Sequence, residues 1–404
     1  MLFFSYLCNV IKIATDKEQA FIISNIDINI SSLLLHKSKY TDIDIGFCAG
    51  QIEGLQVAKE KFPFLFECED FLFAPHMNLE QASSQLTAKY KASLLNKSDV
   101  VADLCAGVGV DSIFFAHNVK KVLAFETNTE LCELDKHNFE VLGLKNITIT
   151  CEDANEALLY LKDVSVIYLD PSRRDSNKNR VYQLKDCSPN ILEMFEELFA
   201  CCQKLMLKLS PMLELNEVIR KVPFIKEIHI VSVKNECKEL LLILQKDYRG
   251  DINYHCINFL SESKKEEFVF FACEEQKTIP IFCKQETEKY IYIPNASILK
   301  SGASNTICSR FGVSKLSIKT NLYTSSSLLT DFQGRGFEVI ERLSPSKVSN
   351  KTFAKANIIA RNYPLSVNQI RQKTKIKEGG EDFLIFTTLQ KDTKATLWCH
   401  IANH

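Results

Sequence analysis

The chain has 404 residues, of which 46% are hydrophobic and 25% are charged, and its 49 basic and 50 acidic residues leave a formal net charge of −1. This composition excludes a disordered or fibrous chain, and the length predicts two or three domains of about 100–200 residues each. The charge is unevenly spread, because residues 300–404 hold 16 basic and 7 acidic residues against 33 and 43 in the remainder. A basic end of this kind can mark a nucleic-acid-binding module.

The fifteen cysteines are scattered along the chain, and no Cys/His group has the spacing of a zinc site, so no metal site is predicted. We interpret the cysteines as thiols, mostly buried, in a reducing compartment. The apolar opening of the chain, residues 1–13, is too short to span a bilayer and has no basic segment or cleavage signal. We expect it to start the first helix or strand, in a cytoplasmic protein without membrane contact.

Residues 1–95 are acidic and mainly helical in pattern, with the clearest helix expected from Leu79 to Leu95. Short apolar runs then alternate with amphipathic ones, which predicts buried parallel strands joined by helices. The expected strands are Val100–Leu104, Lys121–Phe125, Ile147–Cys151, Val164–Leu169, Lys204–Leu209, Glu227–Val233 and Glu239–Gln245. The expected helices are Asp111–Asn118, Glu130–Leu142, Asn155–Leu161 and Ile191–Cys202. Five βα units and a closing antiparallel hairpin predict an α/β fold with a doubly wound, seven-stranded sheet.

After Tyr248 the pattern becomes α+β, which predicts one or two small domains. The expected strands are Tyr254–Phe259, Glu267–Ala272, Glu338–Leu343, Ala356–Arg361 and Asp382–Leu389, and the expected helices are Ala296–Phe311, Pro345–Lys355 and Leu365–Lys375. We place the domain boundaries so that the regions are 1–95, 96–250, 251–325 and 326–404.

Acidic residues close three successive strands. Asp103 precedes a turn that contains Gly107 and Gly109, Glu126 closes the second strand, and Asp153 closes the third. Together they predict a nucleoside site, in which Asp103 faces a positive group, Glu126 accepts ribose hydroxyls and Asp153 accepts an adenine amino group. Each feature also has a structural interpretation, namely a tight turn, a solvated strand end and a helix N-cap.

The fourth strand ends in Tyr168-Leu-Asp170-Pro171-Ser172-Arg173-Arg174. Together with the glycine turn and the three strand-end acids, this motif makes the chain resemble class I S-adenosylmethionine-dependent methyltransferases. More narrowly, the chain resembles the bacterial methyltransferases with a THUMP-like C-terminal domain. The resemblance extends over most of the chain, including residues 75–84, 294–300, 322–325, 356–365 and 379–380. It implies a Rossmann-like sheet, an N-terminal helical region and small ferredoxin-like and THUMP-like C-terminal domains.

The resemblance implies S-adenosyl-L-methionine as the cofactor. The residues that it places at the cofactor are Gln81, Ser83, Ser84, Asp103, Cys105, Ala106, Gly107, Gly109, Glu126, Thr127, Asn128, Asp153, Ala154 and Asp170. For the first three, an ordinary helix N-terminus is the alternative.

The catalytic residues implied are Asp170, Pro171, Ser172 and Arg173. They partly match an Asp/Asn-Pro-Pro-aromatic motif in which the acid accepts a hydrogen bond from an exocyclic NH2 of the base. Arg173 replaces the aromatic residue, and an arginine plane can also stack on a base. A cysteine nucleophile is disfavoured, because neither Cys105 nor Cys187 has a Pro-Cys context or a nearby histidine.

The expected partner is RNA, either tRNA or rRNA, bound by basic side chains. The candidates are Arg173, Arg174, Lys347, Arg361, Arg371, Lys373 and Lys375. A solvated loop and a solvated surface are the alternative interpretations. Two further functions stay open: a methyltransferase acting on protein or small molecules, and a non-catalytic RNA-binding protein on a methyltransferase fold.

Overall fold

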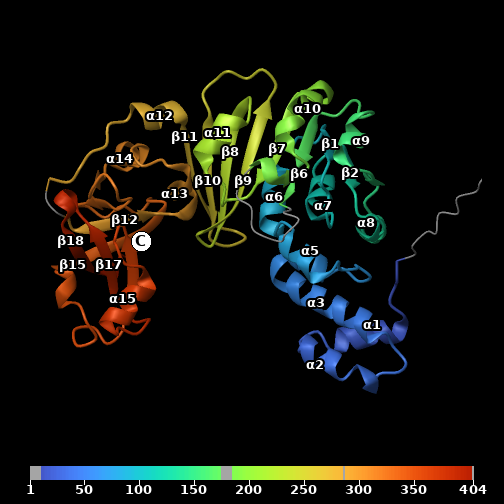
Figure 1. Ribbon diagram of the computed structural model, residues 1–404, viewed down its shortest axis with the longest axis horizontal. Helices are drawn as coiled ribbons and strands as arrows, with labels where there is room; N and C mark the ends of the chain where they lie inside the picture. The colour runs from blue at the N-terminus through green and yellow to red at the C-terminus, as the bar shows by residue number, and fades with distance from the viewer. Residues whose placement is uncertain (1–10, 174–183, 285–286, 403–404) are drawn as a thin grey trace, which may run out of the picture. The chain divides into compact units, whose positions relative to one another are not determined.

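The computed structural model describes residues 11–173, 184–284 and 287–402 (Figure 1). The chain divides into two compact units, which comprise residues 1–225 with 242–248 and residues 226–241 with 249–404. Two successive strands, β8 (Ile225–Val233) and β9 (Glu236–Gln245), therefore each have residues in both units. The element expected at the start of the chain falls largely outside the described residues.

The first unit begins with short helices, as the sequence predicted (Figure 1). They are α1 (Asp16–Ser24), α2 (Ile30–Leu35), α3 (Ile45–Lys61), α4 (Pro63–Phe66), α5 (His76–Gln81) and α6 (Gln85–Ser93). The single helix expected from Leu79 to Leu95 is wrong, because Ala82 is extended and Ser84 caps a new helix by accepting the backbone N–H of Thr87 at 3.3 Å. The longest helix, α3, packs against α1 and α2 around a small apolar core.

A parallel sheet with the order β7-β4-β1-β2-β3 follows in the same unit. Its strands are β1 (Val100–Asp103), β2 (Lys121–Glu126), β3 (Ile147–Cys151), β4 (Val166–Leu169) and β7 (Lys204–Leu209). The helices are α7 (Val110–Ala116), α8 (Thr129–Val141), α9 (Ala154–Leu158), α10 (Phe195–Cys201) and α11 (Leu215–Lys221). These strands confirm the predicted doubly wound α/β arrangement. Because the strands are parallel, their carboxyl ends meet at one edge of the sheet. The count of seven strands is too low, because β8, one of the seven expected strands, also pairs with β10 (Asn253–Phe259), which pairs with β11 (Lys265–Phe271).

The second unit contains two sheet regions. In the first, β10 (Asn253–Phe259) pairs in parallel with β8 and antiparallel with β11 (Lys265–Phe271). The second is a seven-stranded sheet in the order β13-β14-β12-β15-β18-β17-β16. Its strands are β12 (Tyr290–Pro294), β13 (Ser314–Lys315), β14 (Tyr323–Ser325), β15 (Gly334–Leu343), β16 (Asn357–Arg361), β17 (Phe383–Thr388) and β18 (Lys394–Ile401). Its helices are α12 (Ala272–Lys277), α13 (Ala296–Ser301), α14 (Thr306–Phe311) and α15 (Val367–Thr374).

Two predicted helices of this unit are corrected. The helix expected over residues 296–311 is divided into α13 and α14, because Gly302 takes a left-handed conformation (φ +79°) that ends the first helix. The helix expected over residues 345–355 is only a 3-10 turn, Pro345–Lys347. Its serine and threonine side chains bond locally instead, as when the Thr352 hydroxyl donates to the Lys347 carbonyl oxygen at 3.1 Å.

Two general expectations concern thiols and membranes. Every cysteine in the described part of the chain is a free thiol, and only Cys151 is exposed. Within residues 11–173, 184–284 and 287–402, no helix combines the length and apolarity needed to cross a bilayer.

Candidate functional site

The first strand ends in a buried carboxylate. Asp103 is 1% exposed, and its Oδ1 and Oδ2 accept hydrogen bonds from the backbone N–H of Cys105 at 3.1 Å and the Ser112 hydroxyl at 2.7 Å. Burial, together with the neighbouring charges of Asp111 and Asp170, raises the pKa of Asp103 to about 7, against the opposing effect of the hydrogen bond from Ser112. A positive ligand group beside this carboxylate would favour its ionised form.

Glu126, at the end of β2, holds the glycine turn. Its Oε2 accepts the backbone N–H of Gly107 at 2.9 Å, and its Oε1 accepts the backbone N–H of Asn128 at 2.8 Å and the Thr127 hydroxyl at 3.2 Å. A carboxylate has about four acceptor positions. One therefore remains for a ribose hydroxyl, and rotation of the Thr127 hydroxyl would release a second. This arrangement fits the predicted ribose contact.

The turn itself requires glycine. Gly107 (φ +62°) and Gly109 (φ +68°) are both left-handed, and a Cβ on Gly109 would lie 3.0 Å from the Asp135 carboxyl group. The backbone N–H of Ala106 donates to the Phe125 carbonyl oxygen at 2.9 Å and so attaches the turn to β2. Asp135 is fully buried and neither of its carboxyl oxygens has a hydrogen-bond partner, so burial raises its pKa well above the ordinary value. A buried acid therefore lies directly against the turn.

Asp111, in the first turn of α7, is the centre of a buried polar network. Its Oδ2 accepts hydrogen bonds from the hydroxyls of Ser83 at 2.8 Å and Tyr168 at 2.6 Å. Lys91, which is fully buried, lies with Nζ 3.3 Å from Oδ1 of Asp111 and donates to Ser83 at 3.0 Å. Burial would raise the pKa of Asp111, but the charges of Lys91 and Lys208 outweigh it and lower that pKa. This network joins α6, α7 and β4.

The three lead-in residues differ in their surroundings. Ser83 belongs to the network around Asp111, whereas Ser84 is the N-cap of α6 and Gln81 is the exposed last residue of α5. The ordinary helix N-terminus thus accounts for Ser84. Contact of the three with a cofactor stays a prediction.

Asp153 is a helix N-cap, as the alternative interpretation held. Its Oδ1 accepts the backbone N–H groups of Asn155 at 2.7 Å and Glu156 at 3.0 Å, at the start of α9, where Ala154 is buried. Its Oδ2 takes no part in the cap, which leaves that atom for a ligand amino group. Both roles are compatible.

Asp170, directly after β4, forms an ion pair with Lys208 of β7. The strand register explains the contact, because Leu169 is level with Leu207 on the neighbouring strand. The side chain of Lys208 is 12% exposed and that of Asp170 is 33% exposed. Lys208 therefore anchors the carboxylate while part of it remains accessible to a substrate.

The rest of the Asp170 motif forms a small hairpin. Pro171 is buried, and β5 (Ser172–Arg173) pairs antiparallel with β6 (Cys187–Ser188). The backbone of Arg173 is thus placed three residues after the anchored carboxylate of Asp170. Arg174 lies outside the described residues.

The cysteines near this edge are poor nucleophiles. Burial raises the pKa of the Cys105 thiol well above its usual value, and the charges of Asp103 and Asp170 add to the effect. Cys187 is buried in β6. Because the thiolate is the reactive form, these surroundings agree with the low expectation for cysteine catalysis.

The predicted basic residues of the C-terminal region have different environments. Lys347, Lys373 and Lys375 are exposed, in keeping with either a solvated surface or phosphate contact. Arg371 instead donates to the carbonyl oxygens of Ile376 at 3.3 Å and Ala356 at 3.5 Å, so it fastens the end of α15. Arg361 is half-buried, and its Nε has no hydrogen-bond partner. The exposed lysines are therefore the better candidates for an RNA surface.

Comparison with known families identifies the domain that holds these strand ends. Residues 98–258 match the family model of RNA cap guanine-N2 methyltransferases. This part of the chain is a methyltransferase domain. Residues 290–332 match a ferredoxin-like domain family and residues 334–401 match a THUMP domain-like family. The predicted methyltransferase domain, THUMP-like domain and α/β fold are confirmed, and the methyltransferase domain implies S-adenosyl-L-methionine as the methyl donor, as the sequence predicted.

Similar proteins agree with this assignment. An uncharacterized RNA methyltransferase of Oceanobacillus iheyensis is 34% identical over 84 residues, which is 20% of this chain and 18% of that protein. An uncharacterized RNA methyltransferase of Clostridium acetobutylicum is 26% identical over 136 residues, which is 33% of this chain and 29% of that protein. The chain therefore aligns with less than a third of the length of these relatives. A crystal structure of a candidate methyltransferase from Porphyromonas gingivalis W83 has a TM-score of 0.85 and 28% identity, covering 97% of this chain and all of that one.

Sequence reasoning missed three buried charged residues of the methyltransferase domain and its lead-in, namely Lys91, Asp111 and Asp135. Asp135 lies on the apolar face of α8, between Leu131 and Phe139, and an acid at such a position is a signal that could have been used. Lys91 lies on the buried face of α6 and has a similar local signal. What they lie against, the Gly109 turn for Asp135 and the Asp111 carboxylate for Lys91, could not be predicted, because each contact joins separate elements.

Proposed function

We propose that this protein transfers a methyl group from S-adenosyl-L-methionine to a base nitrogen of tRNA or rRNA. The observation that carries the proposal is the partly exposed Asp170 carboxylate, anchored by Lys208 and electrostatically coupled to Asp103 at the edge where the strands of the methyltransferase domain end. The matching family model is one of guanine-N2 methyltransferases, whose acceptor atom is an exocyclic amine. That chemistry supports nitrogen as the acceptor here.

The residues at this edge fit the cofactor. Asp103 and the left-handed glycine turn would receive the methionine portion, Glu126 the ribose and Asp153 the adenine amino group through its Oδ2. The cofactor supplies a methyl group on a positively charged sulfur. Acidic side chains are suited to such a ligand, because the sulfonium and ammonium groups are both cationic.

The methyl transfer requires only orientation and charge from the protein. Asp170 accepts a hydrogen bond from the amino group of the base and turns the nitrogen lone pair toward the methyl carbon. Bound S-adenosyl-L-methionine would supply the methyl group and leave as a neutral thioether, and the nitrogen that gains the N–CH3 bond would lose its proton to Asp170 or to water. The ion pair with Lys208 holds the Asp170 carboxylate in position for this contact.

The basic C-terminal region is the proposed RNA surface, with Lys347, Lys373 and Lys375 as exposed phosphate contacts. The THUMP domain-like match of residues 334–401 covers the same segment. The free thiols support a reducing compartment, and we infer the cytoplasm. We retain the regions 1–95, 96–250, 251–325 and 326–404 as proposed domains.

The first experiment separates catalysis from cofactor binding. RNA from cells that lack this gene is incubated with purified protein and S-adenosyl-L-methionine, and its nucleosides are analysed by mass spectrometry. Asp170→Ala is expected to abolish methyl transfer and to leave calorimetric cofactor binding largely intact. Asp163→Asn, an exposed acid in the loop before β4, is the matched control and should retain activity. Absence of cofactor binding by intact wild-type protein would refute the proposal.

The second experiment identifies the substrate class. Phosphate contacts release counterions, so RNA affinity should fall steeply with salt, and Lys373→Glu with Lys375→Glu should flatten that slope. A weak, salt-insensitive interaction would instead indicate a protein or small-molecule substrate. Cofactor binding without turnover on any cellular RNA would indicate a non-catalytic RNA-binding protein.

A further inference from the structure

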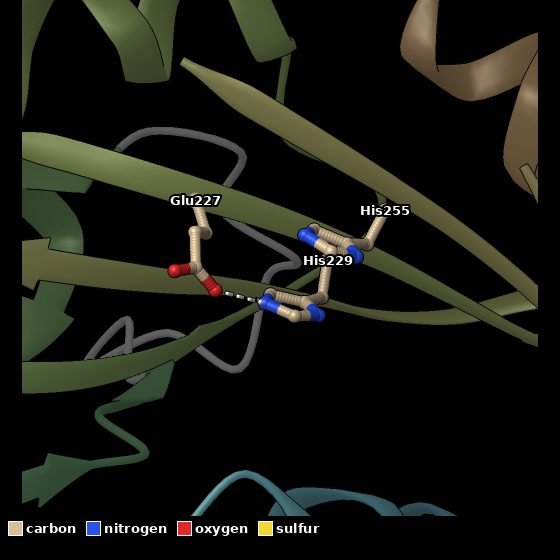
Figure 2. A group of neighbouring side chains, drawn as sticks. All are labelled: Glu227, His229 and His255. Atoms are coloured by element: carbon tan, nitrogen blue, oxygen red, sulfur yellow. Dashed lines mark hydrogen bonds and ion pairs between the residues drawn. The ribbon is translucent and has the colours of Figure 1, made fainter. Parts of the chain in front are cut away.

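Two histidines and a glutamate meet on the strand pair β8–β10 of the second unit. Glu227 and His229 are two residues apart on β8, so their side chains leave the same face of the strand, and His255 is the register partner of His229 on β10. Figure 2 shows the two imidazole rings stacked, with the Glu227 carboxylate at one edge of the His229 ring. The ring centroids are 4.4 Å apart with an interplanar angle of 8°. One potential donor atom from each residue lies within 4.8 Å of the other two.

The spacing of the donor atoms is close to that of a metal site. Tetrahedral zinc, with bonds of about 2.0–2.2 Å, places neighbouring donor atoms about 3.3–3.5 Å apart. Nε2 of His229 and Oε2 of Glu227 are already 3.2 Å apart. The donor atom of His255 therefore needs to approach by about 1.5 Å at most, which side-chain rotation can supply.

Neighbouring polar groups orient these side chains. The Asn253 amide nitrogen lies 2.9 Å from Nε2 of His255 and donates to its lone pair, so an ion that binds this nitrogen takes the place of the Asn253 amide. Nδ1 of the same ring lies 3.9 Å from Oε1 of Glu267, and a carboxylate commonly accepts the second N–H of a metal-bound histidine. Nζ of Lys226 lies 3.3 Å from Oε1 of Glu227, which leaves Oε2 of Glu227 for the histidines.

We propose that Glu227, His229 and His255 bind a divalent transition-metal ion of the zinc class. Two imidazole nitrogens and one carboxylate oxygen are typical zinc ligands, and a water molecule completes the four-coordinate shell. His229 is 1% exposed, whereas the side chains of His255 and Glu227 are 20% and 25% exposed, so the ion enters from their side. The bound ion links β8 to β10 and stabilises this pair of strands.

This site could not be predicted from residue spacing. The third ligand comes from a strand 26 residues further along the chain, and the parallel register brings it beside His229. The expectation of no metal site rested on local cysteine and histidine motifs alone. The proposal is independent of the methyl-transfer function.

The test uses full-length protein that has been stripped of metal and kept reduced. Titration with Co²⁺ is expected to give one equivalent of bound ion with the visible absorption of a four-coordinate nitrogen and oxygen site, which Zn²⁺ then displaces. Zn²⁺ should also raise Tm. Glu227→Gln and His255→Gln each remove one donor at similar volume and should weaken binding at least 10-fold. His400→Gln, which removes a histidine 3.1 Å from Asp382, is the matched control and should bind as wild type.

Three outcomes would overturn the proposal. Equal Co²⁺ affinity in wild type and in both ligand variants would place the ion elsewhere. An intense near-ultraviolet charge-transfer band that persists in both variants would identify cysteine thiolates as the ligands. Failure of folded wild-type protein to take up one equivalent would leave the cluster as a hydrogen-bonded Glu–His pair with a stacked second ring.

Discussion

The protonation of Asp103 should make the stability of the free protein depend on pH. Its pKa is raised from 3.8 to about 7, chiefly by burial, and its two carboxyl oxygens already accept two hydrogen bonds. Between these two values the folded protein holds a proton that the unfolded chain has released. The unfolded state therefore binds fewer protons, and the free energy of unfolding must fall as pH rises through this interval.

The magnitude follows from the size of the shift. Each pH unit inside the interval lowers the free energy of unfolding by about 1.4 kcal/mol. Raising the pH from 5 to 8 should therefore lower it by about 2.5 kcal/mol, and the decrease should level off above pH 7. Asp103→Asn cannot ionise and lacks this contribution. Urea denaturation of both proteins at pH 5 and pH 8 measures the difference between them. Asp42→Asn, which alters an exposed carboxylate, is the control and should follow the wild type.

Cofactor binding provides the second part of the same prediction. A cationic ligand needs the ionised carboxylate, so affinity for S-adenosylmethionine should fall about 10-fold per pH unit below pH 7 in the wild type. In Asp103→Asn the affinity should be low and independent of pH over this range. If the stability difference between wild type and Asp103→Asn is the same at pH 5 and pH 8, the reasoning from burial is refuted.

Two packing predictions can be checked by urea denaturation. Lys91→Met leaves the buried Asp111 carboxylate without its lysine partner and should lower the free energy of unfolding by about 3–5 kcal/mol. Adding Asp111→Asn to this variant should recover part of that loss. A loss below about 1 kcal/mol for Lys91→Met would contradict the buried ion pair. Gly54→Ala would place a Cβ 2.2 Å from Cβ of Phe73 and should cost about 1–3 kcal/mol. Gly50→Ala, in the same helix but with open space, should instead stabilise by about 0.5–1 kcal/mol, and equal effects of the two would refute the packing argument.

The places of the strands along the chain and the acids at their ends could be predicted from the sequence, because both depend on local pattern. Apolar runs of four to six residues become β1–β4 and β7, and Asp103, Glu126 and Asp170 lie at the ends of such runs. Asp153 shows the limit of this reasoning, because a strand-end acid and a helix cap occupy the same position. Only the hydrogen bonds show that one oxygen caps the helix.

What could not be predicted depends on contacts between elements. Lys208 anchors Asp170 because their strands are neighbours in register, and His255 meets His229 for the same reason. The helix predicted over residues 345–355 was wrong for a different reason. Lys347, Lys351 and Lys355 have the spacing of a helix face, but serine and threonine side chains in the same segment compete with the helix and bond to nearby backbone groups instead. Charge periodicity alone does not measure that competition.

Because β8 and β9 each have residues in both units, the chain cannot be divided simply into two parts. Residues 242–248 complete the first unit only after residues 226–241 have contributed to the second. During synthesis, the first unit therefore stays incomplete until a part of its neighbour has already been made. A cut before residue 248 shortens the first unit, and a cut after it separates the second unit from residues 226–241. No single break, whether by a protease or by splitting the gene, yields two whole units.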